Sequence, residues 1–342
     1  MTTLFDDQPN VYVVSGGPEV SKDQSGGRVT VDNFTRAETD HYLAKFVREG
    51  GFGKLQHVRG LVPIEHQAVI RLNRDTLYSC GVFDLDAGPV TVTLPEAGAR
   101  YVAAQVIDED HFVTAVCYAP GAETFSRERV GTRYAAVLIR IFVDPNRPED
   151  FAAVHALQDA IGIQQAAGGS FEVPAWDEES LQRVRRAILA LAAASGGLDS
   201  NRMFGRRDEV DPIQHLLGTA SAWGGNPRTA AMYIGGAPER NDGQTPYRLT
   251  MREVPVDSFW SVSVYNREGF FEKNETETYT INNVTAQPNA DGSVTIHFGG
   301  DARAANFIQI MPGWNYVVRL YRPRAEILEG RWRLPELERA DG

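Results

Sequence analysis

Four polar side chains lie close together in one apolar stretch of the chain: Arg71, Asn73, Asp75 and Tyr78. In an extended strand, residues two apart share a face, so Arg71, Asn73 and Asp75 would form one row with Tyr78 just beyond it. A cation, an amide and a carboxylate in one row can orient a polar ligand through hydrogen bonds. The same row can equally be a buried polar network that locks two domains together. We predict that it lines the functional pocket, with Asp75 and Tyr78 catalytic and Arg71 and Asn73 binding the ligand.

A second polar group is the run Asp-Glu-Asp-His at 108–111. Strand alternation would place Glu109 and His111 on one side, as an acid/base pair or as two metal ligands that need a third. His66 is the nearest further candidate ligand in the sequence. The alternative is a solvated turn between two strands, because a run of acidic residues prefers water. We keep Glu109 and His111 as catalytic candidates and expect no bound metal, since no short His-x-His spacing supports a site.

The last third of the chain carries aromatic residues and an arginine on strand-like runs. Alternation in FWSVSVYN groups Phe259 and Tyr265 on one face and Trp260 on the other, and it groups Arg319 with Tyr321 in a later run. An arginine beside a tyrosine in a sheet can clamp a carboxylate, or it can be a structural group satisfied by carbonyl oxygens. Aromatic side chains can form a sugar platform, although core packing is the usual role of Trp260 and Trp314. The residues predicted to bind a ligand here are Trp260, Tyr265, Arg319 and Tyr321.

Familiar catalytic signatures are missing from the sequence. It contains no GxSxG elbow, no HExxH, no phosphate-binding loop and no dinucleotide fingerprint, and we therefore expect no cofactor. Ser79 and Ser261 have no visible base near them in the sequence, although a serine nucleophile needs one. Cys80 and Cys117 stand in apolar runs without a CxxC pair, which predicts reduced, structural thiols.

Two kinds of periodicity divide the elements that must position these residues. Short runs rich in Val, Ile, Tyr and Thr between about 60 and 143 predict strands of a sandwich, and similar runs return between about 229 and 334. Residues 144–217 show helical spacing, with Pro148 in a first turn, Asp177 as a cap and Pro212 opening a shorter segment. Thr35 and Glu38 fit a capping box for an earlier helix, and residues 1–30 resemble an extended, glycine-rich arm. Repeated strand–helix–strand alternation is absent, which argues against a doubly wound fold.

Composition narrows the setting. The chain has 342 residues, 34 basic and 45 acidic side chains and a net charge of −11, so it would repel a phosphate backbone and nucleic acid is not an expected partner. No apolar run approaches the roughly 20 residues of a membrane span, so no membrane partner is expected. The start MTTLFDDQPN lacks a basic segment and an apolar core, which predicts no signal peptide and a cytoplasmic location.

Several strand-rich blocks resemble a known bacterial family. They are RLNRDTLYSCGVFDLDAGPVTVTLP (71–95), VIDEDHF (106–112), YRLTMREVPVDSFWSVSVYN (247–266) and WNYVVRLYRPRAEILEGRW (314–332). In this order they are similar to the family that pairs the domains of unknown function numbered 1254 and 1214. The resemblance implies an immunoglobulin-like sandwich followed by a jelly roll, and a carboxylesterase label that some members carry. Leu72 stands where proline is usual, and Glu277 stands where relatives tend to have a basic residue, which points to a different ligand.

The predicted organisation is mainly β, with an immunoglobulin-like β-sandwich, a helical connection and a jelly-roll-like β-sandwich. The expected boundaries are an arm and helix at 1–54, a first domain at 55–145, a helical connection at 146–222 and a second domain at 223–342. The expected function is a small-molecule enzyme, hydrolase-type by the family label, with a polar pocket between the domains. The alternative is a non-catalytic protein that binds a carbohydrate or carboxylate. Edge strands that need cover predict a homo-oligomer.

Overall fold

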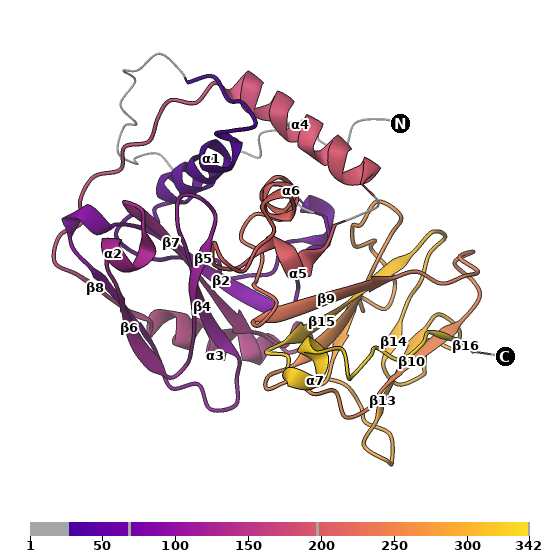
Figure 1. Ribbon diagram of the computed structural model, residues 1–342. Coiled ribbons are helices and arrows are strands. Elements are labelled where there is room, and N and C mark those ends of the chain that lie inside the picture. Colours follow the sequence, from indigo (N-terminus) through magenta and orange to yellow (C-terminus); the bar gives the residue numbers. More distant parts are fainter. Residues whose placement is uncertain (1–26, 68–69, 196–197, 341–342) are drawn as a thin grey trace.

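The computed structural model describes residues 27–67, 70–195 and 198–340, and it is mainly β, as predicted. Figure 1 shows two lobes, an N-terminal one with strands β1 to β8 and a C-terminal one with strands β9 to β16, and a group of helices above the line where they meet. Most of the predicted arm, residues 1–26, lies outside the described residues. None of the described helices is both long and apolar enough to cross a membrane.

The first domain consists of two antiparallel sheets. The larger sheet has the order β1-β2-β7-β4-β5 and the smaller one has the order β6-β3-β8. Apolar side chains from both sheets, such as Leu77, Val92 and Ile139, form one core between them. The strands are β1 (Gln56–His57), β2 (Thr76–Asp84), β3 (Val90–Leu94), β4 (Val102–Ile107), β5 (Val113–Tyr118), β6 (Gly121–Phe125), β7 (Tyr134–Phe142) and β8 (Gly162–Gln165).

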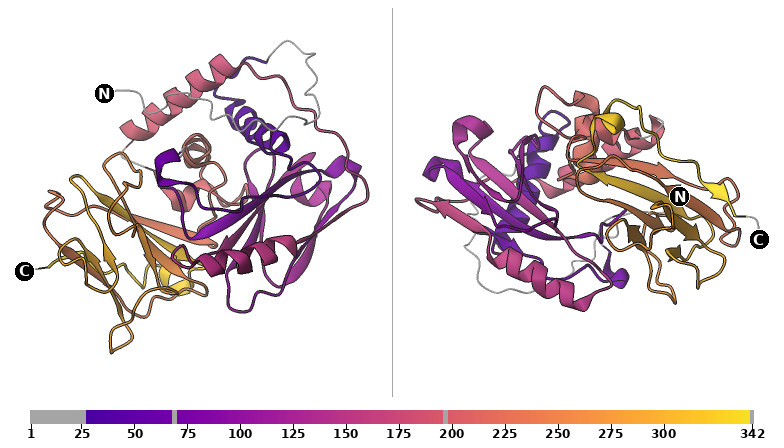
Figure 2. Two further views of the ribbon diagram at one scale, coloured as in Figure 1. Left: turned by 180° about the vertical axis from the view of Figure 1, so that it is seen from behind. Right: turned by 90° about the horizontal axis from the view of Figure 1, so that it is seen from below.

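Helices cover the larger sheet from both sides. Helix α3 packs Val154 into the core between the sheets, whereas Leu43 and Val47 of α1 pack on the opposite face of the larger sheet, which we call the inner face. Figure 2 shows α3 apart from the group of α1, α4 and α6. The helices are α1 (Phe34–Arg48), α2 (Arg127–Val130), α3 (Pro148–Asp159), α4 (Glu178–Ala194), α5 (Ser200–Met203), α6 (Pro212–Ala222) and α7 (Ala325–Leu328), with 3-10 turns η1 (Ile64–His66) and η2 (Leu85–Ala87).

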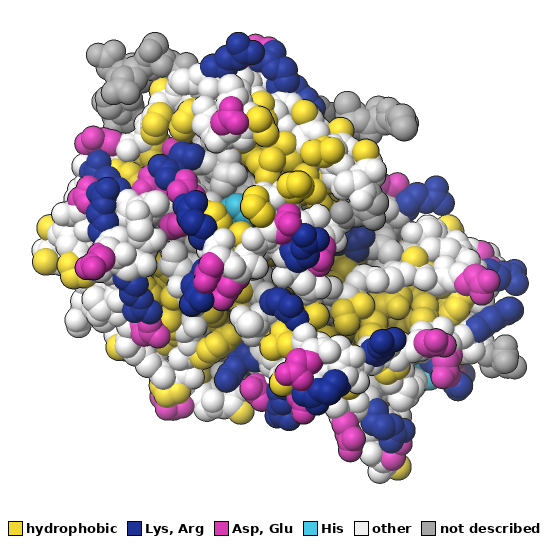
Figure 3. All heavy atoms as spheres, viewed as in Figure 1, with side chains coloured by type: hydrophobic (Ala, Val, Ile, Leu, Met, Phe, Trp, Pro, Cys, Tyr) yellow, Lys and Arg dark blue, Asp and Glu magenta, His cyan; other side chains and the backbone are white. Residues whose placement is uncertain are grey.

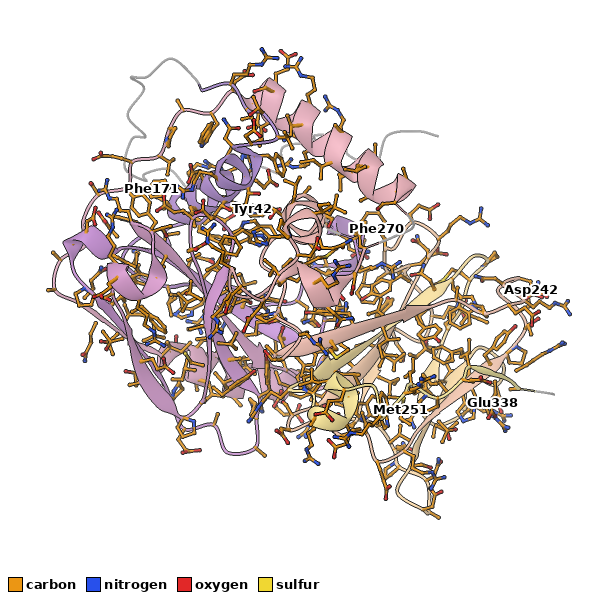
Figure 4. The ribbon with its side chains drawn as sticks, viewed as in Figure 1. Tyr42, Phe171, Asp242, Met251, Phe270 and Glu338 are labelled. Atoms are coloured by element: carbon orange, nitrogen blue, oxygen red, sulfur yellow. The ribbon has the colours of Figure 1, made fainter. Side chains whose placement is uncertain are left out.

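The second domain also pairs two sheets. One has the order β12-β11-β15-β9, the other β14-β13-β10-β16, and residues such as Trp260, Phe298 and Trp314 fill the core between them. In Figure 4, Met251 and Glu338 mark the second sheet, at the far side of this domain from the first domain. The strands are β9 (Ala231–Gly236), β10 (Tyr247–Met251), β11 (Trp260–Tyr265), β12 (Thr280–Asn282), β13 (Val294–Phe298), β14 (Phe307–Ile308), β15 (Asn315–Tyr321) and β16 (Glu338–Arg339).

Some predicted helix caps are present and one is not. Asp177 accepts a hydrogen bond from the backbone N–H of Ser180 at the start of α4, and Asp211 caps α6 with Pro212 at its first position. The predicted capping box of Thr35 and Glu38 is wrong, because Asn33 precedes α1 and makes no side-chain cap. Glu38 is instead buried and paired with Arg185 of α4, so a tertiary ion pair takes the carboxylate that local spacing had assigned to the cap.

Exposed apolar side chains gather on one face of the helical group. Leu191 of α4 and Ile213 of α6 are 52% and 64% exposed, and Leu198 between the two helices is 48% exposed. Figure 3 shows hydrophobic side chains clustered over this part of the molecule, among mixed charges. Contiguous apolar surface often marks an interaction site, but the predicted homo-oligomer stays a prediction.

Candidate functional site

The predicted site residues converge where two sheet faces meet between the domains. Ala103 and Phe142, on the inner face of the larger sheet, pack against the sheet β12-β11-β15-β9 of the second domain. In its two central strands, β11 and β15, every second side chain points toward the first domain, as the predicted alternation implies. Phe259, Ser261, Ser263 and Tyr265 of the β11 region and Val317, Arg319 and Tyr321 of β15 lie on the interface side, whereas Trp260 lies on the other.

Asp75 is the centre of a closed hydrogen-bond network. It is fully buried, and its Oδ2 accepts a hydrogen bond of 2.6 Å from Ser261 Oγ of the second domain. Thr280 Oγ1 donates to Asp75 Oδ1 at 3.5 Å. Burial raises the pKa of Asp75, against the opposing effects of Arg319 and the hydroxyl donors. The carboxylate therefore joins the two domains.

Arg319 is held by oxygen atoms from both domains. Its Nη1 donates to Ser263 Oγ at 2.8 Å, and its Nη2 donates to Tyr265 Oη at 2.6 Å and to the carbonyl oxygen of Arg71 at 2.8 Å. Tyr265 in turn donates to the carbonyl oxygen of Leu72 at 2.8 Å. Arg319 therefore bonds to Tyr265 of the neighbouring strand, whereas the alternation had paired it with Tyr321, whose hydroxyl bonds to Asn73. The partners of Arg319 and Tyr265 are backbone carbonyls and hydroxyls.

The predicted extended row from Arg71 to Asp75 is wrong. Strand β2 begins only at Thr76, and Arg71 has a φ of 53°, in the left-handed region. Asn73 bends the backbone, because its Oδ1 accepts the N–H of Asp75 at 2.8 Å. The Nδ2 of Asn73 reaches Tyr321 Oη at 3.0 Å, whereas Arg71 is exposed and donates to Asn315 Oδ1. The turn therefore brings Asn73 and Asp75 into the interface and turns Arg71 toward its rim.

Tyr78 lies on β2 opposite Arg140 of β7, with the guanidinium 5.3 Å from the centre of the tyrosine ring. Burial on its own would raise the pKa of Tyr78, but the charge of Arg140 and hydrogen bonds with Thr76 and Asn73 outweigh it, and the pKa is lowered. Arg140 Nη2 donates to the carbonyl oxygen of Gly224 at 2.6 Å and Nη1 to Gln105 Oε1. The sequence analysis predicted Tyr78 as a site residue but did not predict Arg140. The signal that could have revealed Arg140 is its position as a charged residue inside the apolar run at 133–143.

An open groove of about 650 Å³ lies at one end of the interface. Arg74 forms part of its wall, with the guanidinium 5.5 Å from the centre of the Tyr279 ring and Nη1 donating to the carbonyl oxygen of Val62 at 2.9 Å. Thr280 connects the groove to the buried carboxylate of Asp75. The lining comes from both domains: Ile64, Glu65, Arg74, Pro145, Asn146, Pro148, Phe151, Lys273, Thr276, Glu277, Tyr279 and Thr280.

Glu109 and His111 lie apart from this interface, beneath the helices. The predicted strand through 108–111 is wrong: β4 ends at Ile107, and a turn follows in which Asp108 Oδ1 accepts the N–H groups of Asp110 and Phe112. The alternative of a turn is therefore correct, but the turn is not solvated, because His111 is fully buried.

The hydrogen bonds of His111 fix it as a neutral ring. Its Nε2 accepts the N–H of Gly224 at 2.8 Å, so Nδ1 carries the hydrogen and donates to Thr219 Oγ1 at 2.8 Å. Burial and the neighbouring His215 hold the pKa of His111 well below its usual value. Glu109 is committed elsewhere: its Oε2 accepts the N–H of Tyr134 at 3.0 Å. Both side chains are therefore engaged in structural contacts. Figure 4 labels Tyr42, a residue of α1 that packs on this side of the sheet against Trp223.

The tryptophans and cysteines singled out in the sequence lie in buried or half-buried positions. Trp260 and Trp314 are buried in the core of the second domain, on the side of β11 and β15 that faces away from the interface. Cys80 is buried and Cys117 half-buried, and both are free thiols. Among the residues that the structure describes, no three His, Cys, Asp or Glu side chains are grouped closely enough to hold a metal ion.

One serine has a histidine partner that the sequence did not reveal. Ser79 of β2 lies directly opposite His57 of β1, with Ser79 Oγ 2.7 Å from His57 Nδ1. Gln158 of α3 donates to the same Ser79 oxygen at 3.3 Å. The serine is fully buried, which limits its access to any substrate.

Family models match both halves of the chain. Residues 52–124 match a protein of unknown function (DUF1254), and residues 230–325 match a protein of unknown function (DUF1214). No curated protein matches the chain. The fold is shared with the VPA0106 protein from Vibrio parahaemolyticus, at 16% identity and a TM-score of 0.67, over 91% of this chain and 98% of that one. A putative uncharacterized protein from Burkholderia cenocepacia is also similar, at 16% identity and a TM-score of 0.48, over 85% and 83% of the two chains.

Proposed function

We propose, for a chain that belongs to the family pairing a DUF1254 domain with a DUF1214 domain, that the groove between its domains binds a small polar molecule bearing a carboxylate. The observation that supports this most directly is Arg74. This half-buried arginine forms no salt bridge within the described residues, although it lines the groove. Burial lowers the pKa of Arg74 and outweighs the opposing effects of Tyr279 and Asp75, as expected for a cation that has lost water without forming a salt bridge. A carboxylate can supply that partner through two parallel hydrogen bonds.

The other charges of the groove restrict the ligand further. Lys273 pairs with Glu65 at 3.0 Å, so these two charges offset each other. Glu277 remains as a second acidic lining residue, held in the left-handed conformation with a φ of 53°. The proposed ligand therefore carries a carboxylate for Arg74 and a hydroxyl or ammonium group for Glu277, as hydroxy acids, amino acids and sugar acids do. Tyr279 offers an aromatic face for its apolar part.

Isothermal titration calorimetry with panels of these three acid classes tests the proposal. We expect at least one class to bind, and Arg74→Gln to weaken that binding by about tenfold or more, because the ligand carboxylate loses its charged partner. Arg303→Gln is the control, since Arg303 is exposed and pairs with Asp301 beside it, away from the groove lining. Equal affinity in wild type and Arg74→Gln, or binding lost equally in both arginine variants, would reject the proposal.

Ester hydrolysis is the second candidate, favoured by the contact between Ser79 and His57. A histidine within hydrogen-bonding distance of a serine is the minimum arrangement for nucleophilic hydrolysis. The enclosed position of Ser79 and its second bond to Gln158 favour binding over this reaction. A panel of chromogenic esters distinguishes the two: turnover that Ser79→Ala abolishes would support hydrolysis, and no turnover, or turnover that Ser79→Ala retains, would exclude this serine as the nucleophile.

A further inference from the structure

Arg140 is a buried cation without an ionic partner among the described residues. It is 6% exposed, and its hydrogen bonds go to the side-chain oxygen of Gln105 and the carbonyl oxygen of Gly224, both uncharged. A buried charge is unfavourable unless a charge of opposite sign or a full set of hydrogen bonds compensates it. The site around Arg140 therefore has an excess of positive charge.

Tyrosine hydroxyls with hydrogens to donate surround this cation. Tyr101 is 6% exposed, and its hydroxyl has no hydrogen-bond partner in the part of the chain that the structure describes. Tyr233 accepts a hydrogen bond from Asn226 at 2.8 Å, which leaves its own hydroxyl hydrogen available. Arg140 lies close enough for its charge to favour the ionised forms of Tyr78 and Tyr101. Tyr233 likewise lies close enough to favour the charged form of Arg140. The cluster therefore offers several donors and no acidic acceptor.

The surroundings leave part of this cluster accessible. Tyr78 and Tyr233 are only half-buried, although most of their neighbours on the two facing sheets are fully buried. Ala103, directly beside Arg140 on the inner face, has a short side chain, and the half-buried Tyr118 stands next to it. Solvent therefore reaches part of Tyr78, Tyr118 and Tyr233, the three half-buried tyrosines around Arg140.

The loop that carries Gly224 is fixed in place. Gly224 donates its N–H to His111 and accepts from Arg140 with its carbonyl oxygen. A Cβ on the adjacent Gly225 would lie 2.3 Å from the ring of Phe204, so only glycine fits there. Arg140 is thus held in one position, as an anion-binding arginine needs to be.

We propose that Arg140, Tyr78 and Tyr101 form a second anion-binding site, which takes the carboxylate of a small monoanion. The guanidinium supplies the charge, and the hydroxyls of Tyr101 and Tyr78 donate hydrogen bonds to the carboxylate oxygens. Tyr233 of this cluster lies on β9, at one edge of the sheet β12-β11-β15-β9, whereas Thr280 of the groove lies on β12 at the other edge. The proposal does not depend on the ligand proposed for Arg74.

Tyr78 provides a direct readout. The charge of Arg140 outweighs burial and lowers the pKa of Tyr78, so Tyr78 is expected to ionise at a lower pH than an ordinary tyrosine. A bound carboxylate offsets that charge and disfavours a second negative charge beside it, so the midpoint of the early step moves to higher pH. The near-ultraviolet absorbance of ionised tyrosine follows this step in the intact protein.

The experiment titrates wild type in sodium acetate and in sodium chloride at equal ionic strength. We expect an early tyrosine step whose midpoint rises in acetate beyond its value in chloride. Tyr78→Phe should remove the step. Tyr101→Phe should keep the step and reduce the acetate shift at least about threefold, because one donor is lost. Tyr101→Phe should fold normally, since the hydroxyl it removes has no partner.

Arg74→Gln separates this site from the groove. An acetate shift that persists in Arg74→Gln supports the inference, whether or not the groove binds a ligand. Equal midpoints in acetate and chloride, an acetate shift that Tyr101→Phe leaves intact, or a shift that Arg74→Gln abolishes would each overturn it.

Discussion

The inner face of the larger sheet is covered in two different ways along its length. One half lies under helices α1 and α6, where His111 is buried, and the other half lies against the second domain, where Arg140 is buried. Both halves bury ionisable side chains at a cost in hydration. The two halves differ in whether the buried side chains find hydrogen-bond partners and opposite charges within the chain.

Beneath the helices the polar side chains of the turn at 108–111 are satisfied within the chain. His111 is neutral and bonded at both ring nitrogens, and Asp108 accepts two backbone N–H groups. Against the second domain, Asp75 is likewise satisfied by Ser261, but Arg140 has only neutral partners. Burial of polar groups alone therefore does not mark a binding site. A local excess of hydrogen-bond donors and positive charge is the more specific sign of an anion-binding site.

The largest effect is expected at Asp75, the closed part of the domain-covered half. Asp75→Ala removes the acceptor of Ser261 and leaves Arg319 buried without its acidic neighbour. We expect the free energy of unfolding to fall by about 4 kcal/mol, measured by urea denaturation. Asp257→Ala is the control: Asp257 pairs with Arg324 at the surface, and its loss should cost about 1 kcal/mol or less.

The same variant also tests whether Asp75 is a structural residue or a ligand-binding one. If Asp75→Ala retains nearly all of its stability but loses the ligand of the groove, then Asp75 belongs to the binding site after all. In that case a satisfied hydrogen-bond network would not distinguish structural residues from functional ones in this interface.

Much of this arrangement follows from local pattern. The alternation within the β11 region and within β15 correctly grouped Phe259 with Tyr265 and Arg319 with Tyr321, because both strands are regular. Asp177 and the pair Asp211–Pro212 also marked helix starts correctly, since capping depends on neighbouring residues. Local pattern therefore predicted the elements and which face each side chain occupies.

The contacts between distant segments were not predictable in this way. The hydrogen bond between Asp75 and Ser261 spans 186 positions, and no local spacing encodes it. The Asn73 turn breaks the strand period just before β2, so the alternation applied there gave the wrong place for Arg71. Arg140 was overlooked because its neighbours in the sequence are apolar, although a charge within a buried strand was itself a signal.

A smaller effect with a distinct pH dependence is expected at Asp108, in the helix-covered half. Burial raises the pKa of Asp108 to about 7, well above the roughly 3.9 of an unfolded chain. The folded state therefore binds a proton more tightly, and stability falls as the pH rises from about 4 through about 7. Asp108→Asn keeps an oxygen for both N–H groups and removes the buried charge.

Urea denaturation of wild type and Asp108→Asn across this pH range checks the sign. We expect little difference near pH 4 and a gain for the variant on the order of 2 kcal/mol above pH 7. Asp208→Asn, at an exposed position, should follow wild type at every pH. If Asp108→Asn is less stable than wild type at high pH, the carboxylate of Asp108 has a charged partner. That result would contradict the view that the two backbone N–H groups alone satisfy this side chain.

The smallest effect is expected at Thr219, the acceptor of the His111 hydrogen. Thr219→Val preserves the shape of the side chain and removes the oxygen. The ring cannot change its tautomer in response, because Nε2 already accepts the N–H of Gly224. The Nδ1 hydrogen is then buried without an acceptor, and we expect a loss of about 1–2 kcal/mol in unfolding free energy. Ser221→Ala removes another helix hydroxyl, which bonds only to the carbonyl oxygen of Leu217, and should be nearly neutral. If Thr219→Val proves as harmless as Ser221→Ala, the imidazole is not locked by these two bonds, and His111 regains the freedom that an acid/base residue needs.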